Sequence, residues 1–252
     1  MISYFNETEL TNLKKQIQQK LNDVFSNFDY KMAMGVQIKA DKSAVTDIDL
    51  FISHSVKRLY ESNEKLKNFH FFSEEDQESF QYPGLILDPI DGTRELVRGI
   101  PECAVSIACA QNNQLQGWGM IFNPFTSFEI NSSNPWVIGP TINQAQLLGL
   151  VSRSEWEKGI YSGHTSGELI LAPRGSIAFK LGLLASGACD FVATLQPKNI
   201  WDIAAGTILC QQRGIYMYHG DEKIERFDER RLSPPLYWCR EEYFKTIRKF
   251  IF

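Results

Sequence analysis

At residues 85–96 the chain reads LILDPIDGTREL, and this stretch decides how the rest of the sequence is interpreted. Its first three residues form an apolar run with the length and flanks of a buried strand. Asp88 and Asp91 follow at the end of that run. Two acids at a strand end suit a cation that holds an oxyanion, with the backbone N–H groups of Gly92 and Thr93 directed at phosphate oxygens. A plain strand-to-turn boundary uses the same residue types, so this stretch alone leaves both interpretations open.

The composition is that of an ordinary globular protein, with 252 residues, 43% of them hydrophobic, and a net charge of −4. A chain without a basic face is a poor partner for a nucleic-acid polymer, although bound cations would still permit an anionic substrate. No segment has the length of a membrane span and the N-terminus lacks a secretory pattern, so we expect a cytoplasmic protein without a membrane partner. Five cysteines without a C-x-x-C pair favour reduced, buried thiols.

Hydrophobic periodicity predicts alternating helices and strands. An amphipathic helix should begin after Asn6, with an apolar stripe that runs from Leu10 to Phe28, and a second helix should follow from Asp49 onward. Strands are expected at 69–72, 85–87, 103–110, 115–122, 125–130, 147–151, 168–172 and 191–195, and further helices at 177–187 and 201–212. This alternation predicts an α/β or α+β layered fold. A polar run at 131–143 suggests two halves, an N-terminal one at 1–135 and a C-terminal one at 136–252.

Further acids stand where predicted strands end or helices begin. Glu74 follows a strand-like aromatic run, and Asp49 and Asp202 lie near the starts of predicted helices. Taken alone, the Asp49 segment is better explained as a helix-capping cluster, Asp202 is either a cap or a ligand, and three successive acids at 74–76 usually form a solvated loop. Acids that share one pocket repel each other unless cations neutralise them, and all-oxygen ligands select hard cations, Mg2+ first and Mn2+ as a substitute.

The chain lacks the common nucleotide-loop and nucleophile motifs. It contains neither G-x-x-x-x-G-K-[ST] nor G-x-G-x-x-G, and its four histidines have no zinc-ligand spacing. The GHTSG segment at 163–167 has Thr165 at its centre, so we interpret it as a loop. A thiol or imidazole catalyst is therefore not supported.

Taken together, the acidic motifs resemble the inositol monophosphatase superfamily. The matching pieces occur in the family's order and are VTDID at 45–49, SEE at 73–75, DPIDGT at 88–93 and WDIAAG at 201–206. The resemblance implies a layered αβαβα sandwich of the inositol monophosphatase and fructose-1,6-bisphosphatase type. It also implies Mg2+-dependent, Li+-sensitive hydrolysis of phosphomonoesters and makes a homodimer the expected assembly.

The resemblance further implies a role for each matched residue. Two or three Mg2+ ions would be held by Glu74, Asp88, Asp91, Asp202 and the carbonyl group of Ile90. The water that attacks phosphorus in line, without a phosphoenzyme, would be oriented and activated by Asp49, Glu74 and Thr93. The phosphate would be held by the amides of Gly92 and Thr93.

Two departures from the family pattern bear on the substrate. Ser53 stands where the family often has a Glu, which alters the support of Asp49 rather than the metal ligands. Inositol monophosphatases proper carry an inositol-binding Glu seven residues before the Asp of the Trp-Asp motif, and that position is Leu195 here. An apolar side chain cannot accept hydrogen bonds from a polyol, which weakens inositol as the substrate unless a loop insertion shifts the count.

Other features resemble the bacterial 3'(2'),5'-bisphosphate nucleotidase branch of the superfamily, namely SEED at 73–76, a basic residue after Asp-Gly-Thr and NIWD at 199–202. A second substrate phosphate needs cations, and the predicted substrate contacts are Gly92, Thr93, Arg94, Ser176 and Lys180. About half of the basic residues near these motifs are expected to be plain surface charges, whereas Lys180, on an apolar helix, requires a partner or a ligand.

These features predict a Mg2+-dependent phosphatase that converts 3'-phosphoadenosine 5'-phosphate to AMP and phosphate. The alternative substrates are inositol-1-phosphate or a sugar phosphate. A catalytically idle protein that binds a metal or a nucleotide is the non-enzyme alternative, and the intact set of predicted ligands argues against it.

Overall fold

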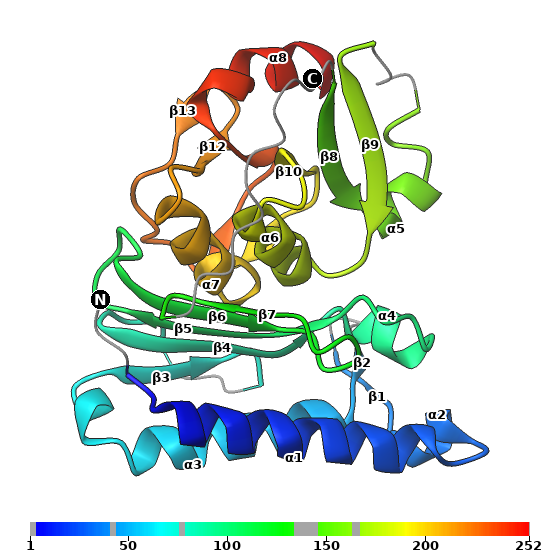
Figure 1. Cartoon of the computed structure of the whole chain (residues 1–252), viewed down its shortest axis with the longest axis vertical. Coiled ribbons are helices and arrows are strands. Elements are labelled where there is room, and N and C mark those ends of the chain that lie inside the picture. The colour runs from blue at the N-terminus through cyan, green and yellow to red at the C-terminus, as the bar shows by residue number, and fades with distance from the viewer. Residues whose placement is uncertain (1–3, 41–43, 76–78, 134–145, 163–166, 252) are drawn as a thin grey trace.

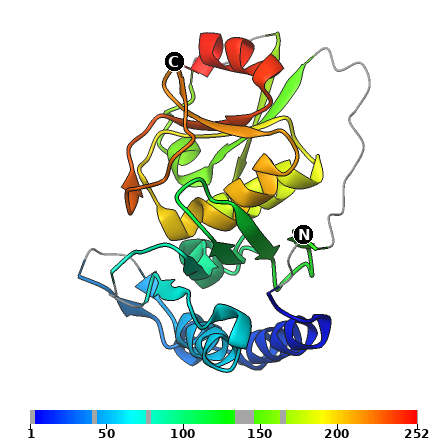
Figure 2. The same cartoon turned by 90° about the vertical axis from the view of Figure 1, so that its left-hand side faces the viewer.

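Helices and sheets alternate in five layers along the length of the molecule (Figure 1). The computed structural model describes residues 4–40, 44–75, 79–133, 146–162 and 167–251. From one end to the other, the layers are a helix pair, a sheet, a second helix pair, a second sheet and a C-terminal helix, as the view turned by 90° also shows (Figure 2). The predicted αβαβα architecture is confirmed.

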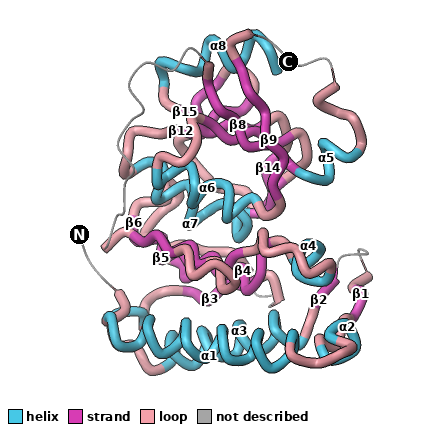
Figure 3. Tube along the Cα trace, turned by 45° about the vertical axis from the view of Figure 1, so that its right-hand side comes forward, coloured by secondary structure: helices cyan, strands magenta, loops and turns pink. Residues whose placement is uncertain are grey.

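The first layer consists of two helices, α1 (Glu7–Phe25) and α3 (Asp47–Glu61), which lie side by side under the first sheet (Figures 1 and 3). Both helices begin with a capping box, closed by Asn6 with Glu9 in α1. The predicted apolar stripe of α1 is buried as far as Val24. Phe28 was wrongly included in it: the helix ends at Phe25, and Phe28 is fully exposed. The connecting elements are α2 (Tyr30–Ala33), β1 (Gln37–Ile38), β2 (Ala44–Val45) and the 3-10 turn η1 (Glu64–Leu66).

The first sheet explains why the stretch at residues 85–96 begins with three apolar residues. Its strands, in spatial order, are β3 (His70–Ser73), β4 (Gly84–Asp91), β5 (Ala104–Ala110), β6 (Gly117–Phe122) and β7 (Glu129–Asn131). β4 is parallel to β3 and antiparallel to β5. Leu85 and Leu87 pack with the α1–α3 layer, whereas Ile86 packs with the central helices. Since both faces of the sheet are covered, β4 is apolar at successive positions rather than alternating.

The remaining three layers come from the second half of the chain. The central pair is α6 (Ile177–Ser186) and α7 (Ile200–Gln211), and the helix that covers the far side is α8 (Glu241–Ile251). The second sheet contains, in order, β13 (Glu222–Lys223), β12 (Tyr216–His219), β15 (Leu236–Cys239), β10 (Phe191–Thr194), β8 (Leu147–Ser152) and β9 (Leu169–Arg174). Three short elements complete the set: α5 (Arg153–Glu157), and the paired strands β11 (Lys198–Asn199) and β14 (Arg231–Leu232).

The cysteines and the lengths of the helices agree with the sequence, whereas two predicted segments fall largely outside the described residues. All five cysteines are free and buried, as predicted. None of the described helices is both long and apolar enough to cross a membrane. The proposed boundary at 131–143 falls largely on residues 134–145, and the GHTSG segment largely on 163–166, which lie outside the described residues. The division into two halves therefore stays a prediction.

Candidate active site

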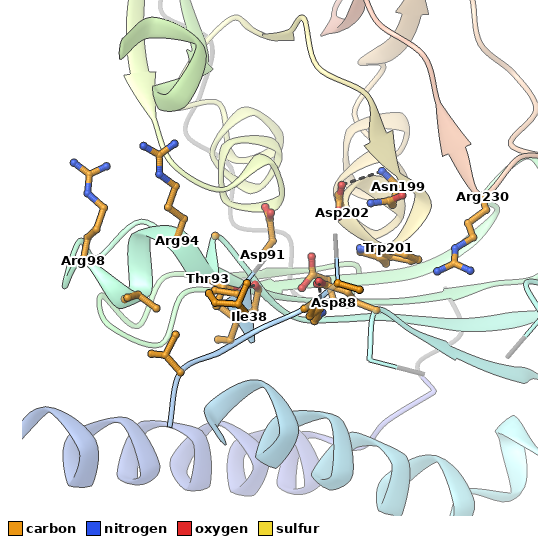
Figure 4. A pocket seen from close by; sticks show the side chains of 18 residues that line it. Ile38, Asp88, Asp91, Thr93, Arg94, Arg98, Asn199, Trp201, Asp202 and Arg230 are labelled. Atoms are coloured by element: carbon orange, nitrogen blue, oxygen red, sulfur yellow. Dashed lines mark hydrogen bonds and ion pairs between the residues drawn. The ribbon is translucent and has the colours of Figure 1, made fainter. Parts of the chain in front are cut away.

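Three carboxylates from two layers of the fold converge at one point (Figure 4). Asp88 and Asp91 come from the end of β4, where the pairing with β5 shifts register, and Asp202 is the third residue of α7. One oxygen from each lies within 4.8 Å of the others. The sequence predicted all three as metal ligands, and the fold brings them together.

Asp88 is the buried member of this group. Its side chain is 1% exposed, and its Oδ1 atom has no hydrogen-bond partner among the described residues. Burial, followed by the charges of Glu74 and Asp91, raises the pKa of Asp88 well above its ordinary value. An unpartnered buried oxygen beside two further carboxylates is costly unless a cation binds it, so the donor set fits a hard divalent ion.

Asp91 and Asp202 each use one oxygen to fix the side chain. Asp91 Oδ2 accepts hydrogen bonds from the Ser176 hydroxyl and the Ala178 N–H, both at 2.6 Å, at the start of α6. Asp202 Oδ2 accepts the Asn199 N–H at 2.9 Å at the start of α7. Burial, then the charge of Asp91, raises the pKa of Asp202 to about 7. The central helices therefore hold two of the three acids in place.

Asp49 and Thr93 form the second part of the site. Asp49 Oδ2 accepts hydrogen bonds from the Thr46 hydroxyl and, at 2.9 Å, from its N–H, which closes the capping box of α3. The Thr93 hydroxyl lies 3.2 Å from Asp49 Oδ1 and 2.9 Å from the Ile90 carbonyl oxygen. Burial raises the pKa of Asp49 to about 7, against the hydrogen bonds from Thr46. The predicted pair is in contact, with a proton acceptor that titrates near neutrality.

Glu74 lines the same cavity and is held by a lysine that the sequence reasoning missed. Lys39 Nζ is 2.8 Å from Glu74 Oε1 and 2.7 Å from Glu75 Oε1. Burial lowers the pKa of Lys39, but the two carboxylates outweigh it and raise this pKa above its usual value. Glu74 is not one of the three clustered acids, and burial raises its pKa despite Lys39. No spacing rule connects Lys39 to these acids, because it reaches them from the β1–β2 hairpin.

Gly92 joins the end of β4 to the short helix α4 (Thr93–Val97). Its φ is +93°, and a Cβ there would lie 2.9 Å from the Glu102 carbonyl oxygen. Both the conformation and the space therefore require glycine. Arg94 of α4 and Arg98, which follows it, face the same cavity and pair with Glu157 at 3.0 and 3.3 Å.

Two predicted substrate contacts have other partners in the structure. Lys180 is 2% exposed, and its Nζ donates to the carbonyl oxygens of Arg174, Gly175 and Ser176 at 3.2, 3.5 and 3.0 Å. Burial, then the charge of Lys198, lowers the pKa of Lys180 to about 8. The Ser176 hydroxyl donates to Asp91 and accepts the Phe179 N–H. Neither residue is among the described residues that line the cavity.

The cavity over the carboxylates has a volume of about 820 Å³. Its lining includes two more residues that sequence reasoning did not assign to the substrate, Trp201 and Arg230. Figure 4 shows Arg94 and Arg98 on one side of the acids and Arg230 on the other. Leu195, where inositol monophosphatases proper have a Glu, is not among the described lining residues.

The profile of the Inositol monophosphatase family matches residues 6–237. The chain is 29% identical over 141 residues to a fructose-1,6-bisphosphatase/inositol-1-monophosphatase of Thermotoga maritima, and this match covers 51% of the chain and about half (54%) of that protein. It is 23% identical over 214 residues to the 3'(2'),5'-bisphosphate nucleotidase CysQ of Aggregatibacter actinomycetemcomitans, covering 73% of the chain and 75% of that protein.

Solved structures share the fold. The Thermotoga maritima IMPase superposes with a TM-score of 0.72 at 18% identity, over 95% of this chain and 94% of that one. CysQ from Bacteroides thetaiotaomicron gives a TM-score of 0.70 at 18% identity, over 94% of this chain and 98% of that one.

Proposed function

The chain belongs to the inositol monophosphatase family, and we propose that it is a Mg2+-dependent phosphomonoesterase acting on 3'-phosphoadenosine 5'-phosphate. The observation that carries the proposal is the convergence of Asp88, Asp91 and Asp202 at an open cavity, with Asp88 Oδ1 buried and unpartnered among the described residues. Such a set of oxygens suits a hard divalent cation, and the family is metal-dependent.

The proposed metal ligands are the three clustered acids, Glu74 and the Ile90 carbonyl oxygen, for two or three Mg2+ ions that Mn2+ can replace. When bound, these ions would neutralise the phosphate, lower the pKa of a coordinated water and stabilise the leaving oxygen. The Ile90 carbonyl already accepts the Thr93 hydroxyl, and a carbonyl oxygen has a second lone pair for a cation.

The chain's own residues supply the acid–base chemistry. The single proton of the Thr93 hydroxyl can point to the Ile90 carbonyl oxygen at 2.9 Å or to Asp49 Oδ1 at 3.2 Å. When it turns to Asp49 Oδ1, Thr93 Oγ1 accepts a hydrogen bond from the attacking water. Water attacks phosphorus in line, the P–O bond to the leaving group breaks, the water proton passes through Thr93 to Asp49, and the leaving oxygen takes a proton from solvent. In the metal-free chain, burial raises the pKa of Asp49 to about 7, so this carboxylate can accept a proton near neutral pH. Glu74 would orient the same water, and the amides of Gly92 and Thr93 would hold the phosphate.

The choice of substrate rests on the cavity and on the relatives. The cavity has room for a nucleotide around the scissile phosphate and carries Lys39, Arg94, Arg98 and Arg230. Leu195 stands where inositol monophosphatases proper have a Glu, so this position has no carboxylate to accept hydrogen bonds from a polyol. Inositol-1-phosphate remains the alternative, because a relative named inositol-1-monophosphatase is 26% identical over 58% of the chain, and one named fructose-1,6-bisphosphatase is 31% identical over 52%. The nucleotidase match is lower in identity, at 23%, but covers 73% of the chain. We also propose a cytoplasmic homodimer, on the buried free cysteines for the location and the family resemblance for the assembly.

The test is phosphate release by the purified protein with Mg2+, in the presence and absence of Li+. The substrates are 3'-phosphoadenosine 5'-phosphate, inositol-1-phosphate and fructose 1,6-bisphosphate, run side by side with Asp88→Asn as the negative control. We expect the nucleotide to be preferred and Li+ to inhibit. A preference for inositol-1-phosphate would overturn the substrate assignment, and activity retained in Asp88→Asn would overturn the metal site.

A further inference from the structure

We propose that Arg230 is the residue that selects substrates with a second anionic group, by binding that group at the side of the cavity opposite Arg94. This inference rests on the proposed function, since it names the feature of the substrate that the same cavity recognises. The expected substrate class is a bisphosphate, with one phosphate at the carboxylate cluster and the other at Arg230.

The pairing of the cavity's cations points to Arg230. Among the residues that the structure describes, four basic side chains line the cavity, namely Lys39, Arg94, Arg98 and Arg230. Lys39 is neutralised by Glu74 and Glu75, and both Arg94 and Arg98 are paired with Glu157. Arg230 has no carboxylate partner within the described part of the chain. Arg94 and Arg98 share the single carboxylate of Glu157, so Arg230 is distinguished as the described lining cation that has no carboxylate partner at all.

Aromatic rings hold the Arg230 guanidinium at the cavity. Its Cζ lies 4.8 Å from the Trp201 ring and 5.4 Å from the Phe72 ring, within the range of a cation–π contact. Trp201 directly precedes Asp202, so the surface that supports the guanidinium belongs to the same helical turn as a proposed metal ligand. A guanidinium over a ring still presents N–H groups at its edge, and their planar fork matches a phosphate or a carboxylate.

The backbone of Arg230 is fixed to the start of α7. The Ile200 N–H donates to the Arg230 carbonyl oxygen at 2.8 Å, and the next residue, Arg231, pairs with Asn199 in the β11–β14 ladder. On the other side, Phe227 is 1% exposed, and its N–H donates to the Asn113 carbonyl oxygen at 2.7 Å. Arg230 is thus a cation on an ordered support beside the carboxylates, which reduces the entropy lost when an anion binds.

Charge also decides where a second phosphate can bind. Asp88, Asp91 and Asp202 repel any anion that is not bridged by a cation. Arg94 and Lys180 were both among the cations that the sequence suggested for the second phosphate, but Lys180 donates to backbone carbonyl oxygens and Arg94 pairs with Glu157. Within the described part of the chain, Arg230 has no such partner to exchange. A nucleoside bisphosphate and a sugar bisphosphate share this chemistry, and the experiment distinguishes them.

The test compares Arg230→Gln with Arg230→Lys, Arg94→Gln and, as a matched control on the adjacent exposed residue, Arg231→Gln. Each is assayed on 3'-phosphoadenosine 5'-phosphate and on 3'-AMP, which has the same scissile ester without the second phosphate. Arg230→Gln should raise KM for the bisphosphate by roughly 10- to 100-fold, with kcat and the KM for 3'-AMP nearly unchanged. Arg230→Lys should recover part of the loss, and Arg231→Gln should resemble the wild type.

The sugar arm uses fructose 1,6-bisphosphate against fructose 1-phosphate in the same variants. A selective loss on the sugar pair alone would support the subsite and assign it to sugar bisphosphates. An unchanged KM for both bisphosphates, or an equal loss on bisphosphates and monophosphates with a lower melting temperature, would overturn the inference and leave Arg230 a packing residue.

A binding measurement separates this inference from the proposed function. Calorimetric titration with the same ligands and Mg2+ is done in a Thr93→Ala background, which lacks the hydroxyl assigned to the attacking water. Tighter binding of a bisphosphate than of its monophosphate, lost in Arg230→Gln, would support the subsite even if the wild type released no phosphate. Equal affinities, or no binding of either ligand, would overturn it.

Discussion

At the scale of single residues, the acids of the site divide their two oxygens between support and chemistry. Asp49 and Asp202 are each the third residue of a helix, and each uses Oδ2 to close a capping box. Capping and ligation were alternatives when only the sequence was considered. In the structure they are compatible, because the bond that caps the helix also fixes the direction of the other oxygen.

The acids could be predicted from sequence because each falls at the boundary of an element, where spacing is informative. Lys39 and Arg230 could not. Lys39 reaches Glu74 from a two-stranded hairpin, and Arg230 comes from a segment with no hydrophobic period that is placed by the β11–β14 ladder. Their positions depend on contacts between residues that are distant in the chain.

Replacing Asp88 with asparagine should separate the chemical role of this residue from its effect on stability. Asp88→Asn keeps the shape and removes the negative charge, so kcat should fall by roughly a hundredfold to a thousandfold, the equivalent of several kcal/mol of charge stabilisation. The metal-free variant should melt at a higher temperature than the metal-free wild type, because a buried carboxylate with an unpartnered oxygen destabilises the fold. Asp23→Asn, on the exposed face of α1, is the control for both measurements. A lower melting temperature would contradict the second expectation.

The raised pKa values predict how the stability of the metal-free protein depends on pH. Asp49 and Asp202 each have a pKa of about 7 in the folded chain, against an ordinary 3.8. The folded state therefore binds more protons than the unfolded state between about pH 4 and pH 7, and its stability falls as the pH rises through that window. The metal-free melting temperature should drop by roughly 5 °C or more between pH 5 and pH 8. Saturating Mg2+ should reduce this drop, whereas a melting temperature that rises without metal would contradict the assignment.

At the scale of elements, the start of α6 fixes the end of β4 by hydrogen bonds to Asp91. Ser176 begins the helix by accepting the Phe179 N–H at 2.9 Å and donates to Asp91 at 2.6 Å. The sequence predicted the helix, since its small and apolar residues repeat at helical spacing. It placed Ser176 at the substrate instead, because no sequence pattern shows that the start of α6 lies against the end of β4.

Ser176→Ala tests this contact between α6 and β4. The change removes the N-cap, which contributes about 1 kcal/mol, and one of the two donors to Asp91 Oδ2. We expect the melting temperature to fall by roughly 2–4 °C and kcat by roughly tenfold, with little change in KM. Ser152→Ala is the matched control, because Ser152 begins α5 without a side-chain cap hydrogen bond. A raised KM with normal kcat would instead favour the direct substrate contact expected from sequence.

At the scale of the whole molecule, the site exists where the first sheet meets the central helices. Asp88 and Asp91 belong to the sheet and Asp202 to α7, so the spacing between these two layers sets the distances between the acids. The periodicity of the sequence predicted that such layers exist. It could not predict how closely they approach, because that depends on small residues in separate elements that face each other.

Gly119 in β6 is the residue at which this spacing can be tested. A Cβ at Gly119 would lie 2.7 Å from the Ala205 carbonyl oxygen of α7, and this backbone atom cannot move without the helix. Gly119→Ala should therefore push α7 away from the sheet and carry Asp202, one turn earlier, away from Asp88. We expect a loss of about 1–3 kcal/mol in the free energy of unfolding, measured by denaturant titration. The kcat of Gly119→Ala should also fall further than the kcat of variants that are equally destabilised by changes elsewhere, because catalysis depends on the separation of the acids. Gly167→Ala, where an added Cβ meets nothing within 4 Å, should change neither quantity. If Gly119→Ala lost stability but kept kcat, the carboxylates would tolerate the displacement, and the layer spacing would not control the site.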